Sequence, residues 1–162
     1  MSTPSAKILI ELLKNNHSIM HQQVKDVTQV ESMVQPPFRG NCLNWDIGHL
    51  LDVYGEMLEE MGLPGTMSEA EKKTYGYGSE PLCDAAKAGD LNAMLARLDK
   101  ALPVIVEKLD SLSAEELERK VKIWRGEVSL IEALFFMQWH ASFHTGQLEL
   151  LRQLSGKNDK VI

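Results

Sequence analysis

Apolar residues recur every three to four positions along four long stretches of the chain, which is the spacing of an amphipathic α-helix. These stretches cover residues 6–27, 44–61, 90–109 and 129–154. Asn44, Asp90 and Ser129 are residue types favoured at helix N-caps, and Gly156 is the favoured type just after a helix end. Strand signals are weak throughout, so the pattern predicts an all-α fold, an antiparallel four-helix bundle.

Loop and capping signals separate the four segments. Residues 35–40 contain two prolines and a glycine, which end a helix. The Ser-x-x-Glu capping box predicts short helices after Ser68 and Ser113, and it also marks the start of the last long helix at Ser129. Residues 67–84 then form a long connection between the second and third helices, of the kind that serves as a lid, a pocket wall or a crossover.

Two places in this pattern are ambiguous. Pro103 lies inside the third helical segment, where it predicts a kink or a break. In residues 120–128, Val121 and Ile123 alternate with lysines before Gly126, so an extended segment or a turn is expected there.

Composition and charge narrow the class of protein. The 162 residues are 44% apolar and 25% charged, which is typical of a soluble globular chain long enough to bury a core. We expect a single domain spanning residues 1–162. The net charge of −6, with scattered basic residues, argues against a nucleic-acid-binding face.

Targeting and redox signals are few. We see no N-terminal signal segment and no apolar run long enough to cross a bilayer, so no membrane association is expected. Cys42 and Cys83 form neither a CxxC motif nor a disulfide framework. Two reduced thiols in a cytoplasmic protein is the simplest interpretation.

Five histidines give the chain its candidate chemistry. His17 and His21 stand four residues apart, and so do His140 and His144. Roughly 0.1 such pairs would be expected by chance in this length, so two pairs are suggestive. Four residues is about 1.1 helical turns, which places both imidazoles of a pair on one helix face, where they can share a divalent metal ion.

His140 and His144 continue the apolar stripe of the last helix, so both should point inward. A buried imidazole needs a partner for each nitrogen, and a metal ion accepts a neutral imidazole nitrogen from each. Two hydrogen-bonded core histidines are the alternative. His17 and His21 share a face as well; they could line the same pocket, form a second and weaker site, or lie at the polar edge of their helix.

His49 is a candidate third ligand from the second helix. It lies beside Gly48, whose small size lets another element approach closely. Taken alone, His49 is most simply interpreted as a histidine at a helix packing surface. Together with His140 and His144 it would make a three-histidine site, which leaves coordination positions open to water or substrate.

The segments NWDIGHLLDVYGEML and WHASFHTGQLELLRQLSGKNDKVI together resemble the DinB/YfiT-type superfamily of metal-dependent enzymes. Its members are four-helix bundles with a histidine on the second helix and a His-x-x-x-His pair on the fourth, followed by Gly-Gln. Those positions are His49, His140 and His144 here, followed by Gly146 and Gln147. The resemblance implies that these three histidines bind a divalent ion, zinc or nickel.

What the resemblance implies about activity is broader. Some relatives act on low-molecular-weight thiols, as thiol-dependent transferases or as isomerases with a thiol cofactor. A metal ion with an open position can hold a thiol as thiolate at neutral pH. We therefore expect a metalloenzyme, a thiol-dependent transferase or a hydrolase, acting on a small-molecule substrate. The alternatives are a non-catalytic metal- or small-ligand-binding stress-response protein, and an interaction module with histidines buried for packing.

Supporting roles follow from spacing. Gln147, one turn beyond His144, could hydrogen-bond a metal-bound water or a ligand imidazole, or make a helix–helix hydrogen bond. Asp46 and Asp52 flank His49 by three residues on either side, so one of them could orient its second ring nitrogen, or both could lie on a solvated face.

Other large side chains suggest pockets and partners. Trp45 and Trp139 are expected in the pocket or the core, and Arg152 in a surface ion pair or against an acidic substrate group. The apolar stripes are wider than a four-helix core requires, which favours a homodimer. The residues that carry this excess are Met57, Met61, Phe135 and Phe136.

Overall fold

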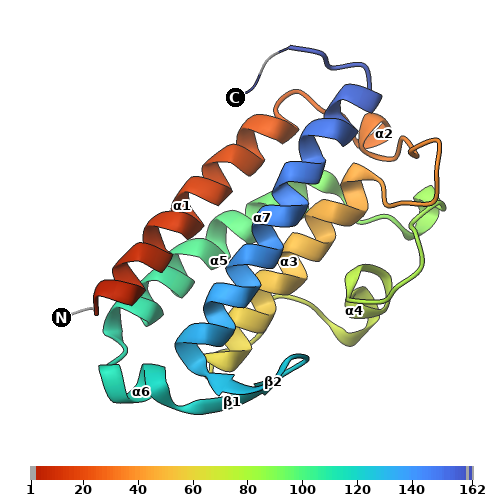
Figure 1. Ribbon diagram of the computed structural model, residues 1–162. Coiled ribbons are helices and arrows are strands. Elements are labelled where there is room, and N and C mark those ends of the chain that lie inside the picture. Colours follow the sequence, from red (N-terminus) through yellow and green to blue (C-terminus); the bar gives the residue numbers. More distant parts are fainter. Residues whose placement is uncertain (1–2, 160, 162) are drawn as a thin grey trace.

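The computed structural model describes residues 3–159 and 161, and four long helices dominate it (Figure 1). These are α1 (Pro4–Val24), α3 (Leu43–Glu60), α5 (Leu91–Ser111) and α7 (Leu130–Leu154). The shorter elements are α2 (Gln29–Ser32), α4 (Glu69–Tyr75), the 3₁₀ turn η1 (Ala85–Lys87), α6 (Ala114–Glu118), β1 (Lys120–Ile123) and β2 (Gly126–Ser129). The structure is mostly helical with one two-stranded sheet, which agrees with the predicted all-α class except at that sheet.

The four long helices pack side by side, with α7 between α1 and α3, and α5 on the other side of both (Figure 1). Their apolar faces meet in one core, whose largest fully buried members include Leu13, Ile47, Tyr54 and Leu98. Most residues of the predicted stripes therefore face neighbouring helices, as amphipathic helices require, whereas Ile8 and Leu12 on α1 are exposed. Among the described residues, no helix combines the length and apolarity needed to cross a bilayer.

The helices do not all run antiparallel to their neighbours. The colours in Figure 1 show α1 and α7 running in one direction and α3 and α5 in the other. Hydrogen bonds agree: Arg152 at the end of α7 bonds the Gln23 carbonyl at the end of α1, and Asn44 at the start of α3 bonds the Gly89 carbonyl just before α5. The expected antiparallel arrangement is met by α3–α7 and α1–α5, but it is wrong for α1–α7 and α3–α5. The long connection after α3 explains this, because it returns the chain to the same end of the molecule before α5 begins.

Most predicted helix starts are confirmed by their caps. Ser68, Ser113 and Ser129 each form a complete capping box, and Asp90 caps α5 through its side chain. Asn44 is not a cap, because α3 begins one residue after Cys42 and takes Asn44 into its first turn. There the Asn44 side chain is buried, and its amide nitrogen donates to the Gly89 carbonyl instead.

The structure resolves both segments whose conformation the sequence left ambiguous. Residues 120–129 form an antiparallel hairpin of β1 and β2, with Ile123 opposite Gly126 at its turn. α5 continues unbroken through Pro103. The small helix α2 was not predicted, although Thr28 and Glu31 form the same capping box that marked the other starts.

Candidate metal centre

His49 on α3 and the pair His140 and His144 on α7 meet where these two helices cross. Their ring centroids lie 4.6 to 5.1 Å apart, and one nitrogen from each lies within 4.8 Å of the others. His49 and His144 are buried and His140 is half-buried. The structure thus brings together the three residues that the sequence singled out, with one edge of the cluster still accessible.

The orientation of His49 follows from its hydrogen bonds. Its Nδ1 lies 2.7 Å from the carbonyl oxygen of Tyr75, which can only accept, so Nδ1 carries the proton. The lone pair of His49 is therefore on Nε2, which points into the cluster and lies 2.9 Å from Nε2 of His140. A neutral imidazole held in this tautomer is the form that binds a metal ion.

Tyr75 reaches His49 because Gly48 has no side chain. A Cβ at Gly48 would lie only 2.1 Å from a ring carbon of Tyr75, so any larger residue would push α4 away. The hydroxyl of Tyr75 donates to Asn44 and accepts from the Gly89 amide, which fixes the segment on both sides. The predicted close approach beside Gly48 is made by α4.

Trp45 forms the wall behind His49. Its ring stacks on the His49 ring at 4.7 Å and 18°, and its indole N–H donates to the Thr74 carbonyl. Trp45 is buried, as expected of a pocket or core aromatic. Trp139 is not, because it lies on the outer face of α7 with 60% of its surface exposed.

Asp46 lies behind His144. Asp46 is only 1% exposed, and its Oδ1 lies 3.4 Å from Nδ1 of His144. Among the described residues neither carboxylate oxygen has a well-formed hydrogen bond. A buried carboxylate without partners is costly, and positive charge on the adjacent imidazole cluster would offset that cost. A divalent ion on Nε2 of His144 supplies that charge, as in carboxylate–histidine–metal arrangements, so the residues fit a metal ion.

The electrostatics favour neutral ligands. Burial, followed by the nearby charge of His144, lowers the pKa of His49 to about 4, although the bond to Tyr75 partly offsets this. Burial and His144 likewise lower the pKa of His140. Burial raises the pKa of Asp46, against the influence of His144. At neutral pH His49 and His140 are therefore uncharged and available as ligands.

A cavity of about 360 Å³ opens beside His140. Its walls come from α3, the segment after α4, the β1–β2 hairpin and α7. Besides His140 they include Glu56, Glu60, Tyr77, Lys122, Trp124 and Phe136. The mixture of aromatic rings with a few charged groups is typical of a small-molecule site.

Glu56 is the titratable group in this cavity that sequence reasoning missed. Desolvation, followed by the like charges of Asp52 and Glu59, raises its pKa to about 7, although Glu56 is an exposed residue at the cavity mouth. A carboxyl group that titrates near neutral pH is suited to proton transfer. The signal in the sequence was a row of acidic residues, Asp52, Glu56 and Glu60, at four-residue spacing along α3.

Two predicted supporting roles are not met. Neither Asp46 nor Asp52 orients His49, because the Tyr75 carbonyl takes its Nδ1. Gln147 lies on the exposed face of α7 and makes no hydrogen bond to the cluster within the described chain.

Arg152 is neither a surface residue nor near the pocket. It is 2% exposed and donates to the carbonyls of Gln23 and Lys25 and to Asp159. It ties the end of α7 to the end of α1.

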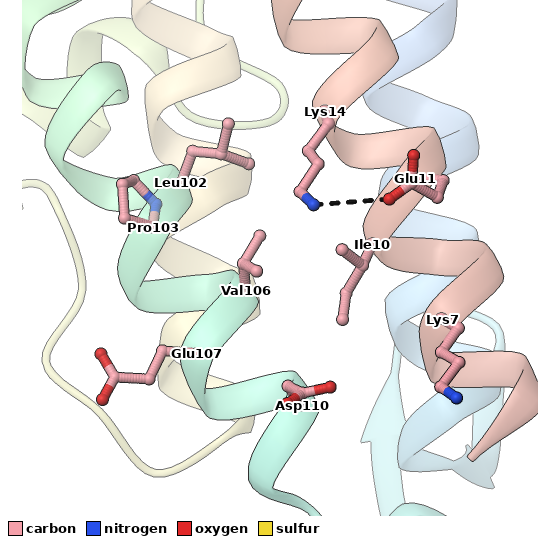
Figure 2. A pocket seen from close by; sticks show the side chains of 9 residues that line it. All are labelled: Lys7, Ile10, Glu11, Lys14, Leu102, Pro103, Val106, Glu107 and Asp110. Atoms are coloured by element: carbon pink, nitrogen blue, oxygen red, sulfur yellow. Dashed lines mark hydrogen bonds and ion pairs between the residues drawn. The ribbon is translucent and has the colours of Figure 1, made fainter. Parts of the chain in front are cut away.

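A larger hollow of about 790 Å³ lies between α1 and α5 (Figure 2). Ile10, Leu102 and Val106 form its apolar floor, and Lys14 pairs with Glu11 at its rim. It contains no histidine or cysteine, so its size does not make it the site of metal chemistry. His17 and His21 lie apart from the three-histidine cluster, against Asp99 of α5.

Comparison with known families matches residues 12–148 to the model of the DinB superfamily. Comparison with curated proteins finds no match. The matched range includes the whole of α3 and α5, parts of α1 and α7, and all three clustered histidines. With the helical fold and the histidine cluster in place, the match shows that the chain belongs to the DinB superfamily.

Proposed function

We propose that the protein is a metal-dependent enzyme in which His49, His140 and His144 hold a divalent ion of the zinc or nickel class. The observation that carries the proposal is the convergence of three imidazoles whose second contacts are already arranged: Tyr75 on His49 and Asp46 near His144. Three protein ligands with one accessible edge are the arrangement of catalytic sites, since a structural zinc site is closed by a fourth.

The substrate side of the proposal rests on the cavity beside His140. A divalent ion held by these three histidines would supply Lewis acidity, which would lower the pKa of a thiol or water in the cavity. The acceptor for the released proton is Glu56, whose pKa of about 7 lets it gain and lose a proton at neutral pH. Trp124 and Phe136 would hold the apolar part of a small substrate.

In thiol transfer, one proton is transferred, one bond forms and one bond breaks. The thiol proton passes to the Glu56 carboxylate, the sulfur forms a bond to an electrophilic carbon, and the bond from that carbon to its leaving group breaks. For hydrolysis, water takes the place of the thiol. In both versions Glu56 acts as general base first and can return the proton to the leaving group.

The test compares zinc-loaded, nickel-loaded and metal-free protein with a panel of low-molecular-weight thiols and one alkyl halide electrophile, with thioether formation followed by mass spectrometry. A parallel panel of ester and amide substrates tests hydrolysis. Metal-dependent turnover that Glu56→Gln reduces, and that Glu107→Gln in the larger hollow leaves unchanged, supports the proposal. Retained metal with no turnover in either panel favours the non-catalytic metal-binding alternative.

The proposed partner is a second copy of the chain. Met57 and Met61 are buried within the protomer and do not provide a surface for it. The exposed residues Trp139, Phe143 and Leu150 do, because their spacing places them in one apolar row along α7. Light scattering should give a dimer mass that Phe143→Glu reduces to the monomer; a monomeric wild type would contradict the proposal.

A further inference from the structure

A second cluster of ligand-type side chains joins α1 to α5. Nε2 of His17 lies 2.9 Å from Oδ1 of Asp99, and Nε2 of His21 lies 2.6 Å from the same oxygen. All three ligand atoms lie within 4.8 Å of one another. Two histidines from one helix and a carboxylate from another therefore converge on a single point.

The spacing of these atoms suits a metal ion after a small adjustment. In a tetrahedral site with bonds of about 2.0 Å to the metal, ligand atoms stand about 3.3 Å apart. The contacts of 2.9 and 2.6 Å need to open by less than about 1 Å, which side-chain rotation supplies. His17 and His21 are already in edge contact on one face, with ring centroids 4.8 Å apart.

Tyr54 allows His17 to be either a hydrogen-bond donor or a metal ligand. Its hydroxyl lies 3.4 Å from Nδ1 of His17 and can donate or accept. While Nε2 of His17 donates to Asp99, Nδ1 accepts from Tyr54. With Nε2 bound to a metal ion, the proton moves to Nδ1, which then donates to Tyr54. No buried polar group loses its partner in either state.

The second cluster is distinct from the first. Tyr54 and His49 are both on α3, but five residues apart, which is about 140° around the helix and about 7.5 Å along it. His49 faces α4 and α7, whereas Tyr54 faces His17 on α1. No residue is common to the two clusters.

We propose that His17, His21 and Asp99 form a second divalent-metal site, independent of the three-histidine cluster, that binds zinc or a similar transition-metal ion. Two imidazoles and one carboxylate are ligands that these ions accept. His21 and Asp99 are partly exposed, with side chains 38% and 50% accessible, so water completes the coordination. The ion would cross-link α1 to α5, and its binding would stabilise the folded chain.

The experiment measures zinc binding to tag-free protein by calorimetric titration, in a Cys83→Ser background because the exposed Cys83 thiol could also bind zinc. The expected stoichiometry is two, with the weaker step assigned to the second cluster. His21→Gln should remove that step, with a loss of affinity of about 100-fold or more. His140→Gln should remove only the tighter step, so failure of either site is seen separately.

Two further variants separate a metal site from a hydrogen-bonded clasp between helices. Asp99→Asn keeps the shape of the side chain and should weaken the second step 10- to 100-fold, and Tyr54→Phe should weaken it by about tenfold. Gln22→Ala, an exposed neighbour of His21, is the matched control and should bind two equivalents. Proton NMR adds an assignment, since zinc should shift the ring signals of His17 and His21 at the second equivalent.

A second equivalent that His21→Gln and Asp99→Asn remove supports the proposal. One equivalent in the parent protein, or a second equivalent that persists in both variants, overturns it. Ring signals of His17 and His21 that stay in place up to two equivalents overturn it as well, because the cluster is then a clasp.

Discussion

The two histidine clusters share the same arrangement of ligand-type residues but differ in burial and surroundings. Each begins with a His-x-x-x-His pair on one long helix and adds one ligand-type side chain from a neighbouring helix. The first is enclosed by Trp45 and Tyr75 and opens at His140 onto a cavity. The second is closed by a direct bond to Asp99 and faces solvent.

The difference lies in what each cluster does without an ion. In the second, Asp99 compensates both histidines, so the cluster is complete as a hydrogen-bonded group. In the first, His140 can donate to His49, but the carboxylate of Asp46 has no well-formed hydrogen bond. Burial without compensation indicates a binding site, whereas compensation near the surface permits a weaker one.

The largest expected effect is loss of the tight ion from the first cluster. His140→Gln removes one of three ligands and should lower zinc affinity on the order of 1,000-fold. Competition with a chromophoric chelator measures this, and His21→Gln serves as the matched control for loss of a helix histidine. Equal affinities in wild type and His140→Gln would remove the distinction between the clusters.

The second effect is a pH dependence of stability that belongs to the first cluster. His49 has a folded-state pKa of about 4 against an ordinary value of 6.5, so the unfolded chain binds more protons between these values. Stability of the metal-free protein should therefore fall as pH drops from about 6.5 to 4, by about 3 kcal/mol from this group.

The raised pKa of Asp46 acts in the opposite direction, since the folded state then binds the extra proton and gains stability as pH falls. Urea unfolding of wild type and His49→Gln at pH 4.5 and 7 isolates the histidine term by difference. The slope with pH should be smaller in His49→Gln, and equal slopes would show that His49 is not held neutral.

The third effect is on kcat, and it distinguishes the cavity beside His140 from the larger hollow between α1 and α5. Glu56→Gln should lower kcat about 100-fold, the usual size of a proton-transfer contribution, while leaving zinc content unchanged. Glu107→Gln, which lines the larger hollow between α1 and α5, should change neither. A reduced zinc content in Glu56→Gln, or an unchanged kcat, would argue against the proton-transfer role.

The smallest expected effect is the change in zinc affinity when Asp46, the carboxylate behind His144, is replaced. Asp46→Asn should weaken zinc binding 10- to 100-fold, because the imidazole loses a charged partner. The metal-free protein should be no less stable, since the variant removes a buried carboxylate with no well-formed hydrogen bond. Thermal melts with and without zinc provide both quantities, and a large loss of stability without zinc would assign Asp46 a purely structural role.

The pairing of His140 with His144 was predictable because its geometry is helical, whereas the expected ligand role of His49 rested on the family resemblance. The spacing of His140 and His144 fixes their common face, and the apolar stripe predicts that this face points inward. Helix starts were predictable for a similar reason, since Ser129 and Ser113 act on backbone groups only three residues away. Asn44 is the exception, because its side chain is used in a tertiary hydrogen bond to the Gly89 carbonyl and not as a cap.

The contacts that orient the ligands were not predictable. His49 is held by a carbonyl from the end of α4, and the path of that segment depends on packing against Gly48. Asp46 was expected beside His49 on its own helix, but it faces His144 across the helix pair. Helix direction was missed likewise, because the length of the 61–90 connection allows α5 to start at either end of α3.

Zinc-edge X-ray absorption of protein loaded with one equivalent of zinc is the most direct test of the three-histidine metal site. We expect nitrogen or oxygen neighbours at about 2.0–2.1 Å with the multiple scattering of three imidazoles, and of only two imidazoles in His140→Gln, where the zinc passes to the second cluster. A sulfur shell at about 2.3 Å, or an imidazole count that His140→Gln leaves unchanged, would contradict it.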